Sequence, residues 1–308
     1  MATAVAASPS AAGRSSIGRS VLPYLLSLPA LLVCIGILIP FFTAAWYSLQ
    51  RYNLNLPMMR KFTWFEQYTQ LFQSHQFWWT LQISLTYAIL AVAIELVLGL
   101  AIAMLLRRRT WYNNALSVAL LLPLMVAPAI ASLMWKLMTH PDFGILSYLL
   151  TLVGVTDFRW ASAPSTALLT VLLVDIWVYT PFIMILLLAG LRALPTQPFE
   201  AAELDGVPGS FVFFRITLPM LMPYIITAAL FRMLDSLQQF DIIYAMTQGG
   251  PGDSLLVFQV QAYLDFFKNF NVGRSTALLM ILWAITYFLS NIFIKQWLRL
   301  RERAHGAA

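Results

Sequence analysis

Six apolar segments of membrane-spanning length divide this chain of 308 residues. A helix needs about 20 mostly apolar residues to cross a bilayer, and each segment is long enough. They run from Val21 to Leu49, Thr80 to Leu106, Ala115 to Met138, Ser165 to Leu191, Leu218 to Met246, and Thr276 to Leu298. Only 10% of the residues are charged, whereas soluble domains carry about 25%. The chain is therefore predicted to be an all-α membrane protein, a six-helix transmembrane bundle.

The basic residues favour one orientation of this bundle. With the N-terminus in the cytoplasm, eleven of the nineteen Lys and Arg fall in inner segments, including the run at 107–109. Both termini are then cytoplasmic, with a flexible tail at 1–20, a six-span domain at 21–298 and a second tail at 299–308. The net charge of +6 is explained by topology, so no nucleic-acid partner is expected.

The N-terminal sequence argues against a cleaved signal peptide, and the single cysteine argues against disulfide or cysteine–metal chemistry. The first apolar run is too long for a typical cleaved signal peptide, which favours a retained signal anchor. Cys34 is the only cysteine, so neither a disulfide framework nor a cysteine-based metal site is available.

A polar stretch separates the fourth and fifth spans at 192–217, and its local signals predict a helix, a turn and a second short helix. Pro195 and Pro198 precede the run FEAAEL, and Glu200 suits the positive end of a helix dipole. Gly206, followed by the Pro-Gly pair at 208–209, ends that helix. These signals alone are also compatible with an ordinary amphipathic connector.

The same stretch carries a spaced pattern: Glu-Ala-Ala, three residues, Gly, nine residues, Ile, any residue, Leu-Pro. It falls on Glu200, Ala201, Ala202, Gly206, Ile216, Leu218 and Pro219. This pattern resembles the cytoplasmic EAA loop of permease subunits in bacterial ATP-binding-cassette importers. A chance connector has no reason to reproduce the later Ile-x-Leu-Pro at the right distance.

A second resemblance lies after the fifth span, in FDIIYAMTQGGPGDS from Phe240 to Ser254. Phe240 and Asp241 followed by Gly-Gly-Pro-Gly resemble the maltose-permease type of the carbohydrate-uptake group. Taken alone, Gly-Gly-Pro-Gly predicts only a tight exposed turn. Aromatic residues in this loop and in the other outer loops, Phe266 and Phe267 among them, are interpreted as interfacial anchors.

The resemblance implies the fold, partners and location of a type I importer permease. These are a second permease subunit, two cytoplasmic ATPase subunits and a periplasmic or lipid-anchored solute-binding protein, assembled at a bacterial inner membrane. No phosphate-binding loop occurs in the chain, so ATP and Mg are expected in the ATPase subunits and no cofactor in this one. The expected ATPase-coupling residues are Glu200, Ala201, Ala202, Asp205 and Gly206.

Polar residues inside the spans point to a substrate path, because charges at membrane depth usually face a cavity or a partner. The candidates in the fifth span share one helical face, and those in the fourth are four residues apart. They are Arg232, Asp235, Ser236 and Gln239, and Asp175 and Tyr179. The alternative is that Arg232 and Asp235 only neutralise each other and that Asp175 and Tyr179 only join helices. Glu95 is expected to bind a structural partner on a neighbouring helix.

Enzyme chemistry has little support in the sequence. His75, His140 and His305 are scattered, with no metal-ligand or nucleophile–base spacing. The chain is therefore predicted to be a non-catalytic permease subunit that imports a sugar, sugar alcohol or related polyhydroxylated solute by alternating access. The alternative is a secondary transporter or channel for a small polar solute, without an ATPase partner.

Overall fold

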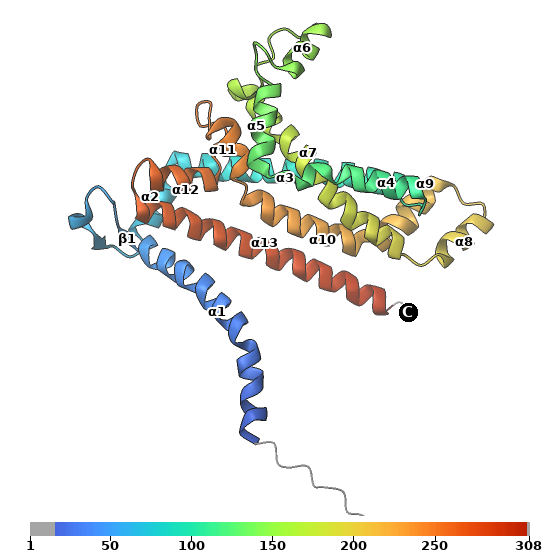
Figure 1. The fold of residues 1–308 in the computed structure, drawn as a ribbon, viewed down its shortest axis with the longest axis horizontal. Helices are drawn as coiled ribbons and strands as arrows, with labels where there is room; N and C mark the ends of the chain where they lie inside the picture. The colour runs from blue at the N-terminus through green and yellow to red at the C-terminus, as the bar shows by residue number, and fades with distance from the viewer. Residues whose placement is uncertain (1–15, 307–308) are drawn as a thin grey trace, which may run out of the picture.

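The computed structural model describes the backbone of residues 16–306 and the side chains of residues 26–299. Its longest helices are α1 (Ser16–Ser48), α3 (His75–Leu105), α7 (Pro164–Ala193), α10 (Leu218–Leu237) and α13 (Val272–Gly306). All five contain segments long and apolar enough to cross a membrane. In Figure 1, α3, α7, α10 and α13 form one bundle, while α1 diverges from it towards its N-terminal end.

The ends of the chain differ in part from the two expected tails. Residues 1–15 of the segment 1–20 lie outside the described residues, and α1 already begins at Ser16. At the other end, α13 continues to Gly306, so most of the segment 299–308 extends the last helix.

Close packing of α3 against α7 forms the centre of the bundle. Gly99 allows this approach, because a Cβ there would lie 2.7 Å from Ile183 Cγ2. α7 is the most buried of the long helices, and its apolar residues Val171, Val174 and Val178 have almost no solvent exposure. The second half of α1 packs on α13, and α10 packs on α3, α7 and α13.

The third expected span, Ala115 to Met138, is not one straight helix. It consists of α4 (Trp111–Leu120), the 3₁₀ turn η2 (Leu122–Met125) and α5 (Pro128–Met138), with a bend of 90° between the two halves. Pro123 and Pro128 account for the break, because proline donates no backbone hydrogen bond and disfavours helix in the residue before it. In Figure 1, α5 runs away from the bundle and carries α6 (Ile145–Leu152) with it.

The fifth expected span, Leu218 to Met246, was predicted too long at its C-terminal end. α10 ends at Leu237, and a separate helix α11 (Asp241–Thr247) follows. Asp241 lies in the first turn of α11, where a carboxylate interacts favourably with the helix dipole. On its N-terminal side α10 continues from α9 (Gly209–Phe211) through the π-helix η4 (Val212–Thr217).

The connecting segments contain structure of their own and define two ends of the bundle. At the α12 end lie β1 (Gln50–Arg51), β2 (Lys61–Phe62), α2 (Glu66–Gln73) and α12 (Phe258–Phe267) (Figure 1). β1 pairs antiparallel with β2, with Gln50 opposite Phe62. The short 3₁₀ helices η1 (Pro57–Met59) and η3 (Trp160–Ser162) complete these connections. At the opposite, α8 end lie α9 and α8 (Gln197–Leu204) (Figure 1).

Candidate functional site

A buried arginine on α10 joins three elements at the centre of the bundle. Arg232 Nε donates to Glu95 Oε2 at 2.7 Å and Nη2 to Glu95 Oε1 at 3.0 Å. Nη2 also donates to Asp175 Oδ2 at 2.5 Å, and Nη1 to Asp235 Oδ2 at 2.8 Å. Because Glu95 lies on α3 and Asp175 on α7, one guanidinium connects three helices through charge-assisted, partly bidentate hydrogen bonds.

Two further side chains complete this ion cluster. The Tyr179 ring lies beneath the guanidinium, with Arg232 Cζ 4.0 Å from the ring centroid. Gln239 Nε2 donates to Asp175 Oδ1 at 3.1 Å, which fixes the second oxygen of that carboxylate. The buried Ser236 lies next to this network, but its hydroxyl is without a hydrogen-bond partner in the described chain.

The cluster has more acidic than basic groups, and its members differ in accessibility. One guanidinium faces three carboxylates, so the fully ionised set carries +1 − 3 = −2 charges. Glu95 and Asp175 have no exposed side-chain surface and Arg232 has 1%, whereas 55% of the Asp235 side chain is exposed. Tyr179 is half-buried. A solute could therefore reach Asp235 and Tyr179, while the other charged groups hold the helices together.

This arrangement changes the interpretation of the predicted helical face. The structure brings Arg232, Asp235 and Gln239 of the fifth span together with Asp175 and Tyr179 of the fourth, as the sequence suggested. Yet most of the face is packed against other helices, so it does not line an open path along its length. The predicted partner of Glu95 on a neighbouring helix is confirmed as Arg232. Sequence reasoning missed that Arg232 binds Asp175 as well.

At the α8 end, the loop predicted from its turn signals forms a helix, a tight turn and a very short helix. Pro198 lies in the first turn of α8 and Glu200 near its positive end. After α8 the backbone of Gly206 adopts φ +65°, a conformation that glycine accepts most readily. The N–H groups of Gly206 and Val207 donate to the carbonyls of Glu203 and Ala202, which satisfies the last turn of α8.

One side of α8 is free for a partner. Ala202 is buried, whereas Glu200, Ala201, Asp205 and Gly206 are exposed. The remaining residues of the spaced pattern, Ile216, Leu218 and Pro219, lie in the π-helix and in the first turn of α10. The exposed side of α8 is therefore connected to α10 through one nearly continuous helical segment.

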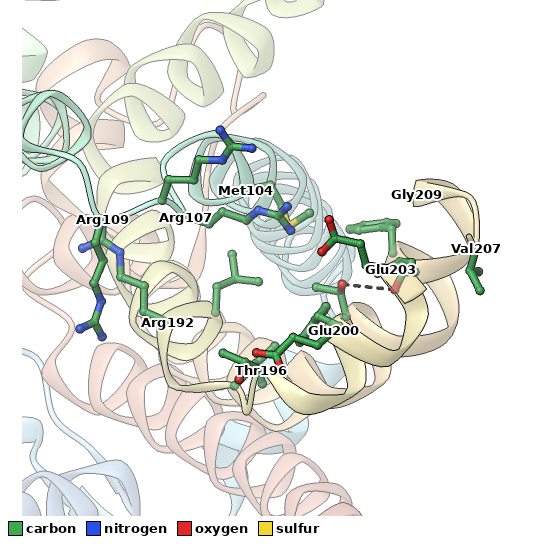
Figure 2. Close-up of a pocket in the computed structure, with 16 residues that line it drawn as sticks. Met104, Arg107, Arg109, Arg192, Thr196, Glu200, Glu203, Val207 and Gly209 are labelled. Carbon is green, nitrogen blue, oxygen red and sulfur yellow. Dashed lines mark hydrogen bonds between the residues drawn. The ribbon is translucent and has the colours of Figure 1, made fainter. Parts of the chain in front are cut away.

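A cavity of about 860 Å³ separates α8 from the ends of α3 and α7. Figure 2 shows Arg107, Arg109 and Arg192 on one side of it and Glu200 and Glu203 on the other. No ion pair joins these two walls among the residues that the structure describes. The basic residues at the ends of α3 and α7 and the acidic residues of α8 therefore attract each other across the cavity.

Arg192 fastens the end of α7 to its neighbours beside this cavity. Its Nη2 donates to the carbonyl of Leu106 at 3.0 Å and to Asn114 Oδ1 at 3.1 Å. Leu106 caps α3 and Asn114 lies on α4. The C-terminal end of α7, just before α8, is thus tied to α3 and α4.

The Gly-Gly-Pro-Gly segment forms the expected turn beyond α11. Gln248, Gly249 and Gly252 all have positive φ, and Trp79 Nε1 donates to the carbonyl of Asp253 at 2.8 Å. The turn is therefore attached to the start of α3. No group of three or more His, Cys, Asp or Glu suited to a metal ion occurs among the described residues.

Comparison with known proteins gives the same family along most of the chain. Residues 95–304 match the model of the binding-protein-dependent transport system inner membrane component. The chain is 31% identical over 275 residues to the trehalose/maltose transport system permease protein MalF of Thermococcus litoralis, covering 89% of this chain and 92% of that protein. It is 33% identical over 279 residues to the trehalose transport system permease protein SugA of Mycobacterium tuberculosis, with coverage of 89% and 88%.

The fold is also similar to solved structures. A chain in the crystal structure of a bacterial ABC transporter involved in the import of the acidic polysaccharide alginate matches with a TM-score of 0.79 and 20% identity, covering 92% of this chain and 97% of that chain. A second match, with a TM-score of 0.75 and 18% identity, is a chain of the alginate transporter in complex with an alginate pentasaccharide-bound periplasmic protein, and it covers 91% of this chain and 96% of that one. The chain belongs to the binding-protein-dependent transport system inner membrane component family and is a permease subunit of an ABC transporter.

Proposed function

We propose that this permease carries a saccharide, a sugar alcohol or a related polyhydroxylated solute into a bacterial cell by alternating access. The observation that carries the proposal is the accessible edge of the ion cluster, where the exposed carboxylate of Asp235 adjoins the half-buried ring of Tyr179. A carboxylate beside an aromatic ring suits a solute with hydroxyl groups and an apolar C–H face. Relatives named for trehalose and maltose support the same class of solute.

Within this proposal the cluster residues have different tasks. Asp235 and Tyr179 contact the solute, while Arg232, Asp175 and Gln239 hold them in position from the buried side. Ser236 adds a hydroxyl beside them. Contacts at so few groups keep binding weak, which suits a site that must release its solute on the other side.

The energy for transport comes from separate subunits. The importer contains a second permease, two ATPase subunits that bind ATP and Mg, and a periplasmic or lipid-anchored solute-binding protein. The coupling loop at 192–217 of the six-span domain 21–298 contacts one ATPase through Glu200, Ala201, Asp205 and Gly206, whereas the buried Ala202, expected to belong to this set, packs α8 against the rest of the chain. Support comes from the exposed side of α8 and from the family. Family membership also sets aside a secondary transporter without an ATPase.

The proposal includes an orientation in the membrane. The α8 end and both termini face the cytoplasm of the inner membrane, and the α12 end receives solute from the binding protein. The arginines at 107–109 beside α8 support this assignment, because cytoplasmic segments are enriched in Lys and Arg.

The test is uptake by the assembled importer. The chain is co-expressed with a candidate second permease, ATPase and binding protein from the same organism, and uptake of radiolabelled trehalose, maltose and a sugar alcohol is measured in cells. The control carries a P-loop Lys→Ala substitution in the ATPase subunit. Saccharide uptake that the control abolishes is the expected result, and uptake that persists in the control contradicts an ATP-driven mechanism.

A further inference from the structure

A second cavity lies at the α12 end, away from the ion cluster. It is an open cavity of about 470 Å³, lined by the end of α10, by α12 and by the first turns of α13. Its side chains include Phe240, Tyr263, Phe266 and Phe267, together with Gln238 and Gln259. None of its lining residues is charged. We call this cavity the aromatic pocket; its volume falls in the range of about 300–1,000 Å³ that is usual for small-molecule sites.

The rings of the pocket hold one another in place. The Tyr263 centroid lies 5.0 Å from that of Phe240 and 4.7 Å from that of Phe267. Behind them Tyr244 stacks on Phe240 at 4.9 Å with an interplanar angle of 14°. Such contacts restrict ring rotation. Phe267 nevertheless keeps 58% of its surface exposed, so part of the aromatic wall remains open to a ligand.

The polar groups of the pocket are free to bind a ligand. The side-chain amides of Gln238 and Gln259 make no hydrogen bond to any part of the chain that the structure describes. Each amide offers two N–H donors and a carbonyl acceptor. Ser275 differs, because its hydroxyl already donates to the carbonyl of Ala262 at 2.7 Å.

The pocket includes two residues that lie close along the chain to the accessible edge of the ion cluster. Gln238 follows Asp235 by three residues, which places both on one face of the chain at the end of α10, and both are exposed. Phe240 directly follows Gln239, which belongs to the cluster. Gln238 is therefore the pocket residue nearest along the chain to the exposed carboxylate of Asp235.

This chemistry selects a neutral saccharide among possible occupants. Flat aromatic faces stack on the C–H face of a pyranose, and free amides pair with its hydroxyls, whereas an anionic ligand would need a cation in the wall. We propose that the aromatic pocket is an entry subsite for saccharide, in which a sugar ring stacks on Tyr263 and Phe267 and binds Gln238 and Gln259 before it reaches Asp235 and Tyr179. The inference rests on the proposed function, and it replaces the interpretation of Phe266 and Phe267 as interfacial anchors alone.

The experiment separates a sugar subsite from an aromatic membrane anchor. Phe267→Leu keeps an apolar side chain and removes the ring, and Phe267→Tyr restores a ring. Phe65→Leu is the matched control, because Phe65 is an exposed ring at the same end of the bundle, 63% accessible and outside the pocket lining. Gln259→Leu tests the amide, and Gln238→Leu provides a second amide variant on a different helix.

Each variant is assembled with its partners and reconstituted, and initial uptake is measured against the concentration of trehalose- or maltose-loaded binding protein. We expect the half-saturating concentration to rise about three- to tenfold in Phe267→Leu and in Gln259→Leu, to recover in Phe267→Tyr and to stay unchanged in Phe65→Leu. Retention of the ATPase subunits on purification reports assembly. Should Phe267→Leu fail to assemble, Gln259→Leu and Gln238→Leu decide the outcome.

The possible failures can be told apart. Equal uptake curves for wild type, Phe267→Leu and both amide variants overturn the subsite and leave the proposed function standing. Equal losses in Phe267→Leu and Phe65→Leu also overturn it, since both rings are then membrane anchors. A wild-type importer that takes up none of the saccharides overturns the proposed function and the subsite together.

Discussion

The Arg232 guanidinium neutralises two carboxylates that are fully buried from water, Glu95 and Asp175. Removing it should therefore destabilise the fold strongly. In Arg232→Met, Glu95 and Asp175 would keep buried charge or have to take up protons. We expect destabilisation of about 3–5 kcal/mol, the usual result of breaking a buried pair from one side. Thermal unfolding of the purified chain in detergent measures it.

The matched change is Asp235→Asn, which removes the most exposed carboxylate and leaves Arg232 with its two buried partners. Because that side chain is largely solvated, its loss should cost no more than about 1 kcal/mol. Equal unfolding temperatures for Arg232→Met and wild type would show that the ion cluster does not hold the helices together.

The solute contacts call for a different pair of variants. Gln239→Leu is unsuitable as a probe, because it would also leave Asp175 Oδ1 without its donor. Asp235→Asn and Tyr179→Phe change only groups that a solute can reach. We expect each to slow uptake several-fold while expression and ATPase retention stay normal, and transport assays at several solute concentrations would check this. Wild-type rate and affinity in both variants would move the solute path to another face.

At the scale of elements, the turn between α8 and α9 should transmit movement from the ATPase only while its shape is kept. A side chain at Gly206 has open space around it, so the cost of Gly206→Leu comes from the positive φ and amounts to about 1–2 kcal/mol. We expect the variant to insert normally and to lose uptake and solute-stimulated ATPase activity. Insertion is checked by membrane fractionation and coupling by ATP hydrolysis with loaded binding protein.

Gly154→Leu controls for backbone strain alone. Gly154 has φ +86° and an equally open surrounding, but it follows α6, far along the chain from α8. It should keep transport. Wild-type uptake in Gly206→Leu would remove the role of this turn in coupling, and loss in both variants would point to general misfolding.

The molecule as a whole places the coupling turn and the Gly-Gly-Pro-Gly turn at different ends of the bundle. A single cysteine at Ser210 or at Asp253, in a Cys34→Ser background, should therefore react from opposite sides of the membrane. Both positions are exposed, whereas the hydroxyl of neighbouring Ser254 is buried, which makes Asp253 the better site. We expect a membrane-impermeant maleimide to label Asp253→Cys in intact spheroplasts and Ser210→Cys only after lysis.

Labelling of both cysteines from one side would show that α10 does not cross the membrane and would reject the six-span topology, whereas reversed labelling would reject the orientation. Lysed cells in detergent serve as the reference for full reactivity.

The apolar surface of α1 is largely uncovered in the chain by itself. In its apolar segment Leu26–Ser48, the most hydrophobic window has no residue buried against the rest of the chain. Large side chains such as Leu32 and Ile37 are exposed over more than half of their surface. Lipid or another protein must cover this surface, because apolar area of this extent is unfavourable in water.

Local sequence was sufficient for much of this protein. Hydropathy over about 20 residues identified four of the long helices closely and the start of α10, because the bilayer sets the length of any spanning segment. The turn at Gly206 was predictable for a similar reason: a short acidic helix followed by glycine ends itself through its own backbone bonds. The spaced pattern from Glu200 to Pro219 then identified the family.

Tertiary structure alone decided the sites. Glu95 and Asp175 lie 137 and 57 residues from Arg232, and only helix packing brings the three together. The same packing buries most of the polar face of α10 and leaves Asp235 accessible. Helical periodicity places these residues on one face but does not show which of them is buried. Phe266 and Phe267 look like membrane anchors in sequence. They line a pocket because α10 ends at Leu237 and α12 packs beside α13. Such contacts between distant parts of the chain, which hydropathy does not encode, decide which residues meet in space.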